Sequence, residues 1–363
     1  MEHVKYIKRA MALARKSSGF TSPNPMVGAV LVKRGRIIAE DYHRAPGTPH
    51  AEALVLEHAG RKAEGASLYV NLEPCCHTDK RTPPCTGVII RAGVKRVFVA
   101  MKDPNPKVSG EVIRELRRAG VAVDCGILEE EAGKLNEAYC KYITQGIPFV
   151  TLKVAMTLDG KIALPSGESR WITGERSRRL VHHMRSSVDA VLTAIGTVRA
   201  DNPELTARIR GGKDPKRIVI DPSLEIPDGY KILDVPPETI IVTERNAGDG
   251  RIEELSDKGV KFIFYRGTLH LGRLMERLGV MGITSLMIEG GSSLTSHALR
   301  DGVVDKVVFF ISPKIAGGKD SYPAVGGESC GTLKDAYRIE DIKVKRRGED
   351  IIIEGYTERR HSE

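Results

Sequence analysis

Residues 47–52 read GTPHAE, and residues 74–85 read PCCHTDKRTPPC. Within these two stretches, His50, Cys75 and Cys85 offer one imidazole and two thiolates. This three-ligand set suits tetrahedral zinc, with the fourth position open to a water molecule. Bound zinc lowers the pKa of such a water to about 7, which supplies a nucleophile at neutral pH. The two stretches therefore predict a catalytic zinc site in the front half of the chain.

Glu52 follows His50 by two positions. On a regular helix, residues i and i+2 do not share a face, so Glu52 is not expected to be a fourth ligand. At the start of a helix it can instead lie beside the metal-bound water and carry protons. Cys75 and Cys85 both lie near predicted helix starts, where the helix N-terminus favours the thiolate form that binds metal.

Other readings of the same region stay open. Cys76 or His77 could supply a fourth ligand and close the site into a structural one, although adjacent side chains rarely reach one tetrahedral ion together. Asn24, His43 and Arg81 are polar residues expected near the mouth of the pocket. Arg81 could bind a substrate phosphate as a charged donor. Each of these three could also have a simple surface or turn role.

The pattern around these ligands resembles the cytidine-deaminase superfamily, whose signature is H-x-E followed by P-C-x-x-C. This chain departs from that signature, because nine residues separate Cys75 from Cys85. A long insert ending in RTPPC resembles the riboflavin-pathway branch of the superfamily, and the flanking SPNP at 22–25 and DPNP at 103–106 agree. The match extends over most of residues 1–145. It implies a three-layer α/β domain with Glu52 as the catalytic residue.

The second half carries a separate set of motifs. Residues 150–163 read VTLKVAMTLDGKIA, residues 166–173 read SGESRWIT, and residues 196–203 read GTVRADNP. Together they resemble the reductase domain of the bifunctional riboflavin-pathway enzymes, which has a dihydrofolate-reductase-like fold. The resemblance extends over roughly residues 147–320. It implies that the second half binds NADPH.

One segment of the second half has a physical logic of its own. Residues 285–288 read SLMI, an apolar strand, and residues 289–293 read EGGSS, after which we expect a helix from Leu294. A strand, a glycine pair and a helix start form a phosphate cradle of backbone N–H groups. A bare glycine pair can also be purely structural. No G-x-G-x-x-G fingerprint of the common dinucleotide-binding fold is present.

Carried over position by position, the resemblance implies two sets of contacts. Contacts with NADPH are implied for Ala155, Trp171, Thr197, Asp201, Ser223, Gly291, Ser292, Ser293, Leu294, Thr295, Ser296 and His297. Contacts with substrate are implied for Ser169, Arg185, Leu205, Arg208 and Glu289.

Several of these residues also allow other interpretations. Trp171 is the only tryptophan and could be a core aromatic. Arg185 and Arg208 suit a phosphate through bidentate, charge-assisted bonds, or they could be ordinary surface charges. Lys153 is a further candidate for a polar contact with substrate. Arg199 is a candidate for the residue that selects NADPH over NADH.

The length and patterning predict two α/β domains. A chain of 363 residues is about twice the usual domain size. β-Branched runs alternate with helical stretches, and turn residues near 145–148 place the boundary after residue 146. The resemblance then implies a deaminase domain at 1–146 and a reductase domain at 147–363. Strands are expected at 27–32, 37–39, 68–72, 97–101, 149–156, 190–195, 217–220, 239–242, 261–265, 285–288 and 306–311, and helices at 51–59, 86–92 and 110–119.

Charge and hydropathy limit the partners. The net charge is +9, and residues 1–146 carry 23 Lys and Arg against 16 Asp and Glu, or +7. A basic front half favours an anionic ligand, such as a phosphorylated small molecule or a nucleic acid, or is simply a solvated surface. No run approaches the roughly 18 apolar residues of a membrane span. The first residues predict an amphipathic helix of the fold rather than a signal peptide, so we expect a cytoplasmic protein.

These observations together predict a bifunctional enzyme. The resemblance implies zinc-dependent deamination of 2,5-diamino-6-(5-phosphoribosylamino)pyrimidin-4-one, followed by NADPH-dependent reduction of the ribosyl chain to ribityl. The expected partner is this phosphorylated pyrimidine, with no nucleic acid or membrane, and the chain is expected to form a homo-oligomer. Two alternatives remain: a nucleic-acid deaminase with an appended RNA-binding half, and a non-catalytic binding protein stabilised by zinc.

Overall fold

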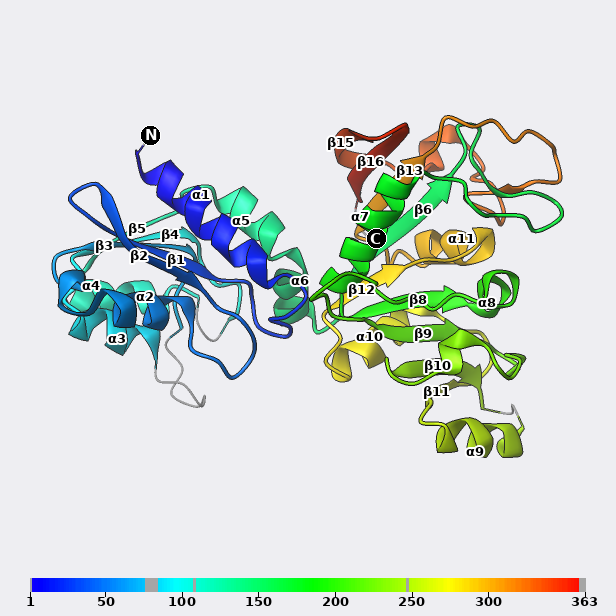
Figure 1. The fold of residues 1–363 in the computed structure, drawn as a ribbon, viewed down its shortest axis with the longest axis horizontal. Coiled ribbons are helices and arrows are strands. Elements are labelled where there is room, and N and C mark those ends of the chain that lie inside the picture. The colour runs from blue at the N-terminus through cyan, green and yellow to red at the C-terminus, as the bar shows by residue number, and fades with distance from the viewer. Residues whose placement is uncertain (1, 76–83, 107–108, 246–247, 359–363) are drawn as a thin grey trace. The chain divides into compact units, whose positions relative to one another are not determined.

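The computed structural model describes residues 2–75, 84–106, 109–245 and 248–358 (Figure 1). The chain divides into two compact units, Met1–Gly146 and Ile147–Glu363. Each unit has its own β-sheet, with helices on both faces. Among the described residues, no helix is long and apolar enough to cross a bilayer.

The sheet of the first unit has five strands in the order β2-β1-β3-β4-β5. Strand β1 is antiparallel to both of its neighbours, whereas β3, β4 and β5 are parallel to one another. Consequently the carboxyl ends of β3 and β4 meet at one edge, where loops can bring side chains together. The strands are β1 (Gly28–Lys33), β2 (Arg36–Tyr42), β3 (Ser67–Leu72), β4 (Arg96–Met101) and β5 (Ala122–Cys125).

Two layers of helices cover this sheet, because alternate residues of each strand point to opposite faces. Leu31 belongs to one apolar cluster, together with residues of α2, α3 and α4, and Val30 to the other, together with residues of α1 and α5. Gly28 lets α1 lie directly on β1, since a Cβ there would come within 2.1 Å of the Ala10 carbonyl oxygen. The helices are α1 (Glu2–Ala14), α2 (Ala51–Ala59), α3 (Cys85–Arg91), α4 (Glu111–Arg118), α5 (Glu129–Leu135) and α6 (Glu137–Gln145), with short 3-10 turns η1 (Arg15–Ser17) and η2 (Gly60–Ala63).

The second unit is built on a nine-stranded sheet in the order β11-β10-β9-β8-β12-β6-β13-β16-β15. The strands from β11 to β13 are parallel, and β16 and β15 complete the sheet in antiparallel fashion. A separate small sheet pairs β7 with β14. The strands are β6 (Phe149–Met156), β7 (Lys161–Ala163), β8 (Ala190–Ala194), β9 (Lys216–Ile220), β10 (Thr239–Glu244), β11 (Lys261–Tyr265), β12 (Ser285–Ile288), β13 (Lys306–Ile311), β14 (Tyr322–Pro323), β15 (Ile339–Arg347) and β16 (Asp350–Thr357).

Helices again pack on both faces of the large sheet. Leu286 and Ile288 pack with the apolar residues of α10 and α11, whereas Met287 points to the other face, where α8 and α9 contribute. Val181 of α7 packs against β13 and β16. The helices are α7 (Glu175–Ser187), α8 (Ile195–Asp201), α9 (Asp249–Asp257), α10 (Leu271–Val280) and α11 (Ser292–Arg300), with short 3-10 turns η3 (Lys231–Leu233) and η4 (Leu333–Asp335).

The structure confirms most of the predicted elements and corrects two features. The helix at 51–59 and the strand at 149–156 have the predicted bounds. Helix α11 begins at Ser292 rather than Leu294, because Gly291 already acts as its N-cap residue. Strands β5, β7, β14, β15 and β16 were not predicted. Almost every residue of β15 is exposed, so its sequence lacks the buried apolar face on which strand prediction depends.

Candidate functional sites

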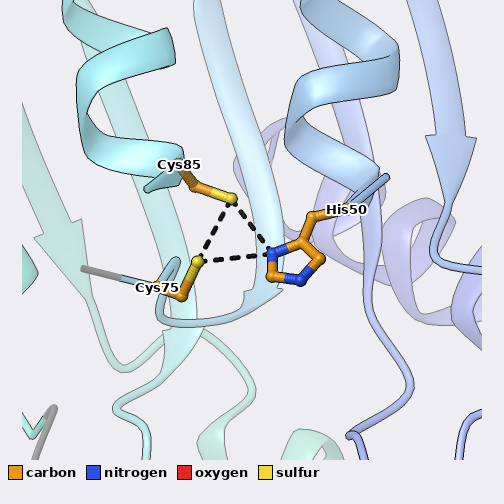
Figure 2. Close-up of side chains that lie close together, drawn as sticks. All are labelled: His50, Cys75 and Cys85. Atoms are coloured by element: carbon orange, nitrogen blue, oxygen red, sulfur yellow. Dashed lines mark hydrogen bonds between the residues drawn. The ribbon is translucent and has the colours of Figure 1, made fainter. Parts of the chain in front are cut away.

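His50, Cys75 and Cys85 converge in the first unit (Figure 2). His50 is the N-cap residue of α2, Cys85 is the first residue of α3, and Cys75 follows β3. His50 Nδ1 lies 3.2 Å from the Cys85 Sγ and 3.3 Å from the Cys75 Sγ, and the two sulfur atoms are 3.5 Å apart. A backbone bond of 3.1 Å from the Cys85 N–H to the Cys75 carbonyl holds the two cysteines together.

This donor set fits zinc. Zinc bonds of about 2.3 Å to sulfur and about 2.0 Å to nitrogen in a tetrahedron place neighbouring ligand atoms about 3.5 Å apart, close to the separations found here. The Cys75 thiol also favours the thiolate form that binds metal. The hydrogen bond with Cys85, together with His50, lowers the pKa of Cys75 to about 4, although burial opposes this shift. The three residues therefore suit a site with three protein ligands.

Glu52 lies in the first turn of α2 and is buried. Its Oε2 atom has no hydrogen-bond partner among the described residues. Burial raises the pKa of Glu52 to about 6, although the charge of His50 opposes this shift. A buried carboxylate oxygen without a partner is unusual, and a water molecule held next to His50, Cys75 and Cys85 would satisfy it. Glu52 is not part of the ligand group, as its spacing from His50 predicted.

His43 and Asn24 lie beside the ligand group. The His43 ring is buried and packs edge-on to His50, with 5.2 Å between ring centroids. His43 Nδ1 lies 3.2 Å from the Pro49 carbonyl oxygen, and its Nε2 lies 3.2 Å from Asn24 Nδ2. His43 therefore orients the residues that precede His50, whereas Asn24 is only partly buried. Cys76, His77 and Arg81 lie outside the described residues.

The side chains that hold the loops around this site were not predicted from the sequence. The Asn71 and Asn136 amides both bind the backbone of Met26, which fixes the segment that carries Asn24. Buried Glu73, two residues before Cys75, accepts backbone N–H bonds from Asp103, Gly110 and Ile113. Such backbone-binding carboxylates and amides leave no spacing pattern, because their partners are backbone groups far away in the chain.

In the second unit, the predicted residues follow the carboxyl ends of parallel strands. Ala155 is near the end of β6, Thr197 follows β8 and Ser223 follows β9. Glu289 and Gly291 follow β12, which lies between β8 and β6. In open α/β sheets, ligands bind at this edge. The structure therefore brings these residues to one edge of the sheet.

A buried group of charges lies at this edge. Arg185 of α7 donates to both oxygens of Glu289, from Nε at 2.7 Å and from Nη2 at 3.0 Å. Lys153 Nζ lies 3.3 Å from the Glu289 Oε2. Burial by itself raises the pKa of Glu289, but the charges of Arg185 and Lys153 outweigh it and hold the pKa at about 2. Arg185 thus binds Glu289 through Nε and Nη2, and its contact with substrate stays a prediction.

Arg208 is the other predicted arginine, and its side chain is exposed. Its backbone has a positive φ of 52°. Burial and the nearby charge of Arg185 both lower the pKa of Arg208. His182, one turn before Arg185 on α7, has a buried Nδ1 atom without a partner among the described residues. Burial and then the charge of Arg208 lower the pKa of His182.

The structure joins a predicted substrate residue to a predicted cofactor residue. Ser169 Oγ donates to the Asp201 Oδ1 at 2.9 Å, and Arg170 Nε lies 3.4 Å from the same oxygen. The neighbouring Trp171 is 59% exposed, which excludes a place in the core. The guanidinium carbon of Arg178 lies 4.5 Å from the centre of the Trp171 ring. Trp171 is therefore available for stacking.

Gly290, the first glycine of the pair before α11, permits close packing. A Cβ on Gly290 would meet the Leu294 side chain at 2.6 Å, and a Cβ on Gly291 would lie 3.6 Å from Thr197 Oγ1. Thr197 and the start of α11 are thus neighbours. Leu294 and Thr295 are buried, whereas Ser293 and His297 are exposed.

Two further predicted contact residues, Leu205 and Ser223, lie in a buried apolar cluster and in an exposed turn, respectively. The Leu205 side chain is buried in an apolar cluster, so any contact with substrate would come from its backbone. Ser223 is exposed in the turn after β9. The Asp221 carboxylate, which accepts backbone N–H bonds from Glu225 and Ile226, fixes this turn.

The two sites define a zinc-dependent deaminase joined to a reductase, and comparison with known proteins agrees. Residues 1–101 match the family model described as the cytidine and deoxycytidylate deaminase zinc-binding region, and residues 148–353 match the RibD C-terminal domain. The fold class is therefore α/β, with an N-terminal cytidine-deaminase domain and a C-terminal dihydrofolate-reductase-like RibD domain.

The chain is similar over nearly its whole length to riboflavin biosynthesis proteins named RibD. It is 45% identical to the riboflavin biosynthesis protein RibD of Aquifex aeolicus, over 96% of each chain. It is 37% identical to RibD of Escherichia coli, over 97% of this chain and 99% of that one. Among solved structures, form 1 of Acinetobacter baumannii RibD has a TM-score of 0.90 and 35% identity, covering 98% of this chain and 99% of that chain.

A second solved structure has a name that states two activities. The diaminohydroxyphosphoribosylaminopyrimidine deaminase/5-amino-6-(5-phosphoribosylamino)uracil reductase of Thermotoga maritima is 37% identical, with a TM-score of 0.87 and coverage of 98% and 99%. This chain belongs to the RibD family of riboflavin biosynthesis proteins. It is a deaminase and a reductase of that pathway. Its N-terminal part contains the zinc-binding region, and its C-terminal part is a reductase that uses NAD(P)H.

Proposed function

We propose that residues 1–146 deaminate 2,5-diamino-6-(5-phosphoribosylamino)pyrimidin-4-one and that residues 147–363 reduce the ribosyl chain of the product with NADPH. The observation that carries the first step is the convergence of His50, Cys75 and Cys85 beside buried Glu52. The name of the Thermotoga maritima relative supports this pair of substrates.

In the deaminase, His50, Cys75 and Cys85 would hold zinc, which would activate a water molecule as a Lewis acid when bound. Glu52 would accept one proton from the attacking water and deliver it to the ring nitrogen. Glu52 would then accept the second proton of that water, from the hydroxyl of the tetrahedral adduct, and deliver it to the amino group, which leaves as ammonia. Its raised pKa suits this exchange, because a carboxyl with a pKa of about 6 both accepts and releases protons near neutral pH. The ring carbon that bears the 2-amino group receives the oxygen.

In the reductase, the nicotinamide cofactor supplies hydride to C1 of the ribose when bound. The proposed cofactor contacts are Ala155, Trp171, Thr197, Asp201, Ser223 and the run Gly291 to His297. The proposed substrate contacts are Ser169, Arg185, Leu205, Arg208 and Glu289, with Lys153 beside them. Because Arg185 is bound to Glu289, exposed Arg208 is the arginine proposed to bind the substrate phosphate.

A coupled assay tests the proposal. Purified protein with stoichiometric zinc is given the diaminopyrimidine ribosyl phosphate and NADPH, and ammonia release and NADPH oxidation are followed separately. Both signals are expected, with reduction dependent on deamination. Ammonia release without NADPH oxidation would contradict the reductase assignment. The absence of both signals would contradict the proposed substrate. Supplying the deaminated uracil product directly should restore NADPH oxidation in a variant that cannot deaminate.

The proposal also covers location and assembly. The described cysteines are free thiols, as a zinc site needs, and this supports a cytoplasmic location.

Strand β15 is an exposed sheet edge, acidic at Glu340 and Asp341 and basic at Arg346 and Arg347. Antiparallel pairing with β15 of a second copy would place opposite charges together, so we infer a homodimer. Light scattering of Val344→Pro should show the monomer, and a wild-type monomer would contradict this.

A further inference from the structure

Residues 312–327, which we call the strap, follow β13 and lie against two other parts of the second unit. The strap contains β14, which pairs with β7. The Leu158 N–H donates to the Lys314 carbonyl at 2.7 Å, and the Gly326 N–H donates to the Ser292 carbonyl at 3.1 Å. In Figure 1 the strap is the orange loop that follows β13, beside the green loop that follows β6. It thus connects the turn between β6 and β7 to the start of α11.

One carboxylate fastens the strap. Asp159, in the turn between β6 and β7, accepts hydrogen bonds from the Thr157 hydroxyl at 2.6 Å, the Ala316 N–H at 3.0 Å and the Gly317 N–H at 2.7 Å. The bond from Thr157, followed by those from Ala316 and Gly317, lowers the pKa of Asp159 to about 2. Asp159 is therefore ionised at neutral pH, and two of its three donors belong to the strap.

The turn itself does not require this carboxylate. It is closed by backbone bonds from the Gly160 N–H to the Thr157 carbonyl at 3.0 Å and from the Thr157 N–H to the Lys161 carbonyl at 2.9 Å. The Asp159 side chain instead reaches across to residues more than 150 positions later in the chain. Besides its local bond with Thr157, Asp159 therefore holds two distant segments together.

Both ends of the strap meet proposed cofactor contacts. At the near end, Lys314 Nζ donates to the Trp171 carbonyl at 2.7 Å. At the far end, glycines let the strap touch α11, since a Cβ on Gly326 would lie 2.5 Å from Ser292 Oγ and one on Gly327 would lie 2.4 Å from Ser296 Oγ. The strap thus spans the distance between Trp171 and the first turn of α11.

We propose that Asp159 is a positioning residue of the reductase, which fastens the strap so that Trp171 and the first turn of α11 face one bound nicotinamide cofactor. This inference rests on the proposed function, because the cofactor contacts of Trp171 and α11 are part of it. Loss of the carboxylate releases the near end of the strap and loosens both contacts. It weakens cofactor binding without removing any group that touches the reacting atoms.

The test uses the full chain and three variants. Asp159→Ala removes all three bonds, Asp159→Asn keeps the shape without the charge, and Asp320→Asn removes a charge from an exposed position elsewhere in the strap. NADPH oxidation with the deaminated substrate gives KM and kcat, and ammonia release by the first unit serves as a control for the amount of protein. Asp159→Ala should raise the KM for NADPH about tenfold, the effect of losing hydrogen bonds to a charged group, with kcat within about twofold.

The outcomes distinguish the proposed role of Asp159 from the proposed reductase function. Asp159→Asn should show a smaller rise in KM, and Asp320→Asn should match the wild type, with ammonia release unchanged in every variant. If Asp159→Ala fails to fold, Lys314→Met tests the bond to Trp171 alone, and it should also raise the KM. Wild-type kinetics in Asp159→Ala, or in Lys314→Met as its replacement, would overturn the inference alone. Wild-type protein that oxidises no NADPH would overturn the proposed function.

Discussion

Arg185 and Glu289, 104 positions apart in the chain, form a bidentate ion pair with N–O distances of 2.7 and 3.0 Å. Both side chains are buried, and Lys153 adds a second positive charge to the same carboxylate. Each partner offsets the cost of burying the other, because neither charge is solvated by bulk water. The pair therefore fixes Glu289 in one orientation where the chain leaves β12.

Removing the negative charge should destabilise the second unit. Glu289→Gln leaves the charges of Arg185 and Lys153 buried without compensation, at an expected cost of about 3 kcal/mol in the free energy of unfolding. Chemical denaturation measures this loss. Glu225→Gln is the matched control, since the ion pair of Glu225 with Arg199 is half exposed and should contribute less than about 1 kcal/mol. Equal effects of the two changes would contradict the burial argument.

The same pair predicts a pH dependence of stability. The pKa of Glu289 in the folded protein is about 2, below its ordinary value of 4.5, so the folded state binds the proton less tightly than the unfolded state. The contribution of Glu289 is therefore complete above pH 4.5 and is lost as the pH falls toward 2. The Glu289→Gln variant should not show this part of the decrease in the free energy of unfolding at low pH. Parallel denaturation profiles of wild type and variant between pH 5 and 3 would contradict the expectation.

The zinc ligands could be predicted because metal binding restricts both residue type and spacing. His50, Cys75 and Cys85 were identified from the sequence, and the structure brings them together. Glu73 and Asn136 were not, because they bind backbone groups at Gly110 and Met26, which any residue offers. The partner of Arg185 could not be read from residue type alone, since a phosphate and a carboxylate satisfy the same guanidinium, and the structure places Glu289 there.

Strands β6 and β15 show one reason why some strands could be predicted and others could not. Strand β6 has the expected bounds because its apolar run is covered on both faces of a parallel sheet. Strand β15 carries charges along its whole length and depends on pairing with β16, which no local pattern indicates. The same holds for the strap, whose place follows from hydrogen bonds to Asp159.

Glu52→Gln should abolish deamination and retain zinc. The amide cannot accept the proton of the water or return it, so ammonia release should fall by at least about 100-fold. Metal analysis should still find one zinc per chain, because Glu52 is not one of the converging ligands. Reduction of supplied uracil substrate is the internal control. Loss of zinc together with activity would make Glu52 a ligand.

Cys85→Ser should lose stoichiometric zinc. The hydroxyl is a poor substitute for a thiolate, and Cys85 lies within 3.5 Å of both other ligands. Cys330→Ser is the control, because Cys330 is free and exposed, and this variant should keep its zinc. Metal content after gel filtration measures the difference. Full zinc in Cys85→Ser would show that another residue completes the site.

Trp171 should report cofactor binding directly. It is the only tryptophan, so all tryptophan emission comes from one place. Its ring is exposed, and the guanidinium carbons of Arg178 and Arg170 lie 4.5 and 5.6 Å from the ring centre. Titration with NADPH should quench this emission and sensitise emission from the reduced nicotinamide. Trp171→Phe should remove the signal and raise the KM for NADPH several-fold, because stacking is weakened. Unchanged emission in wild-type protein that oxidises NADPH would place the cofactor away from Trp171 and would leave the strap without its proposed purpose.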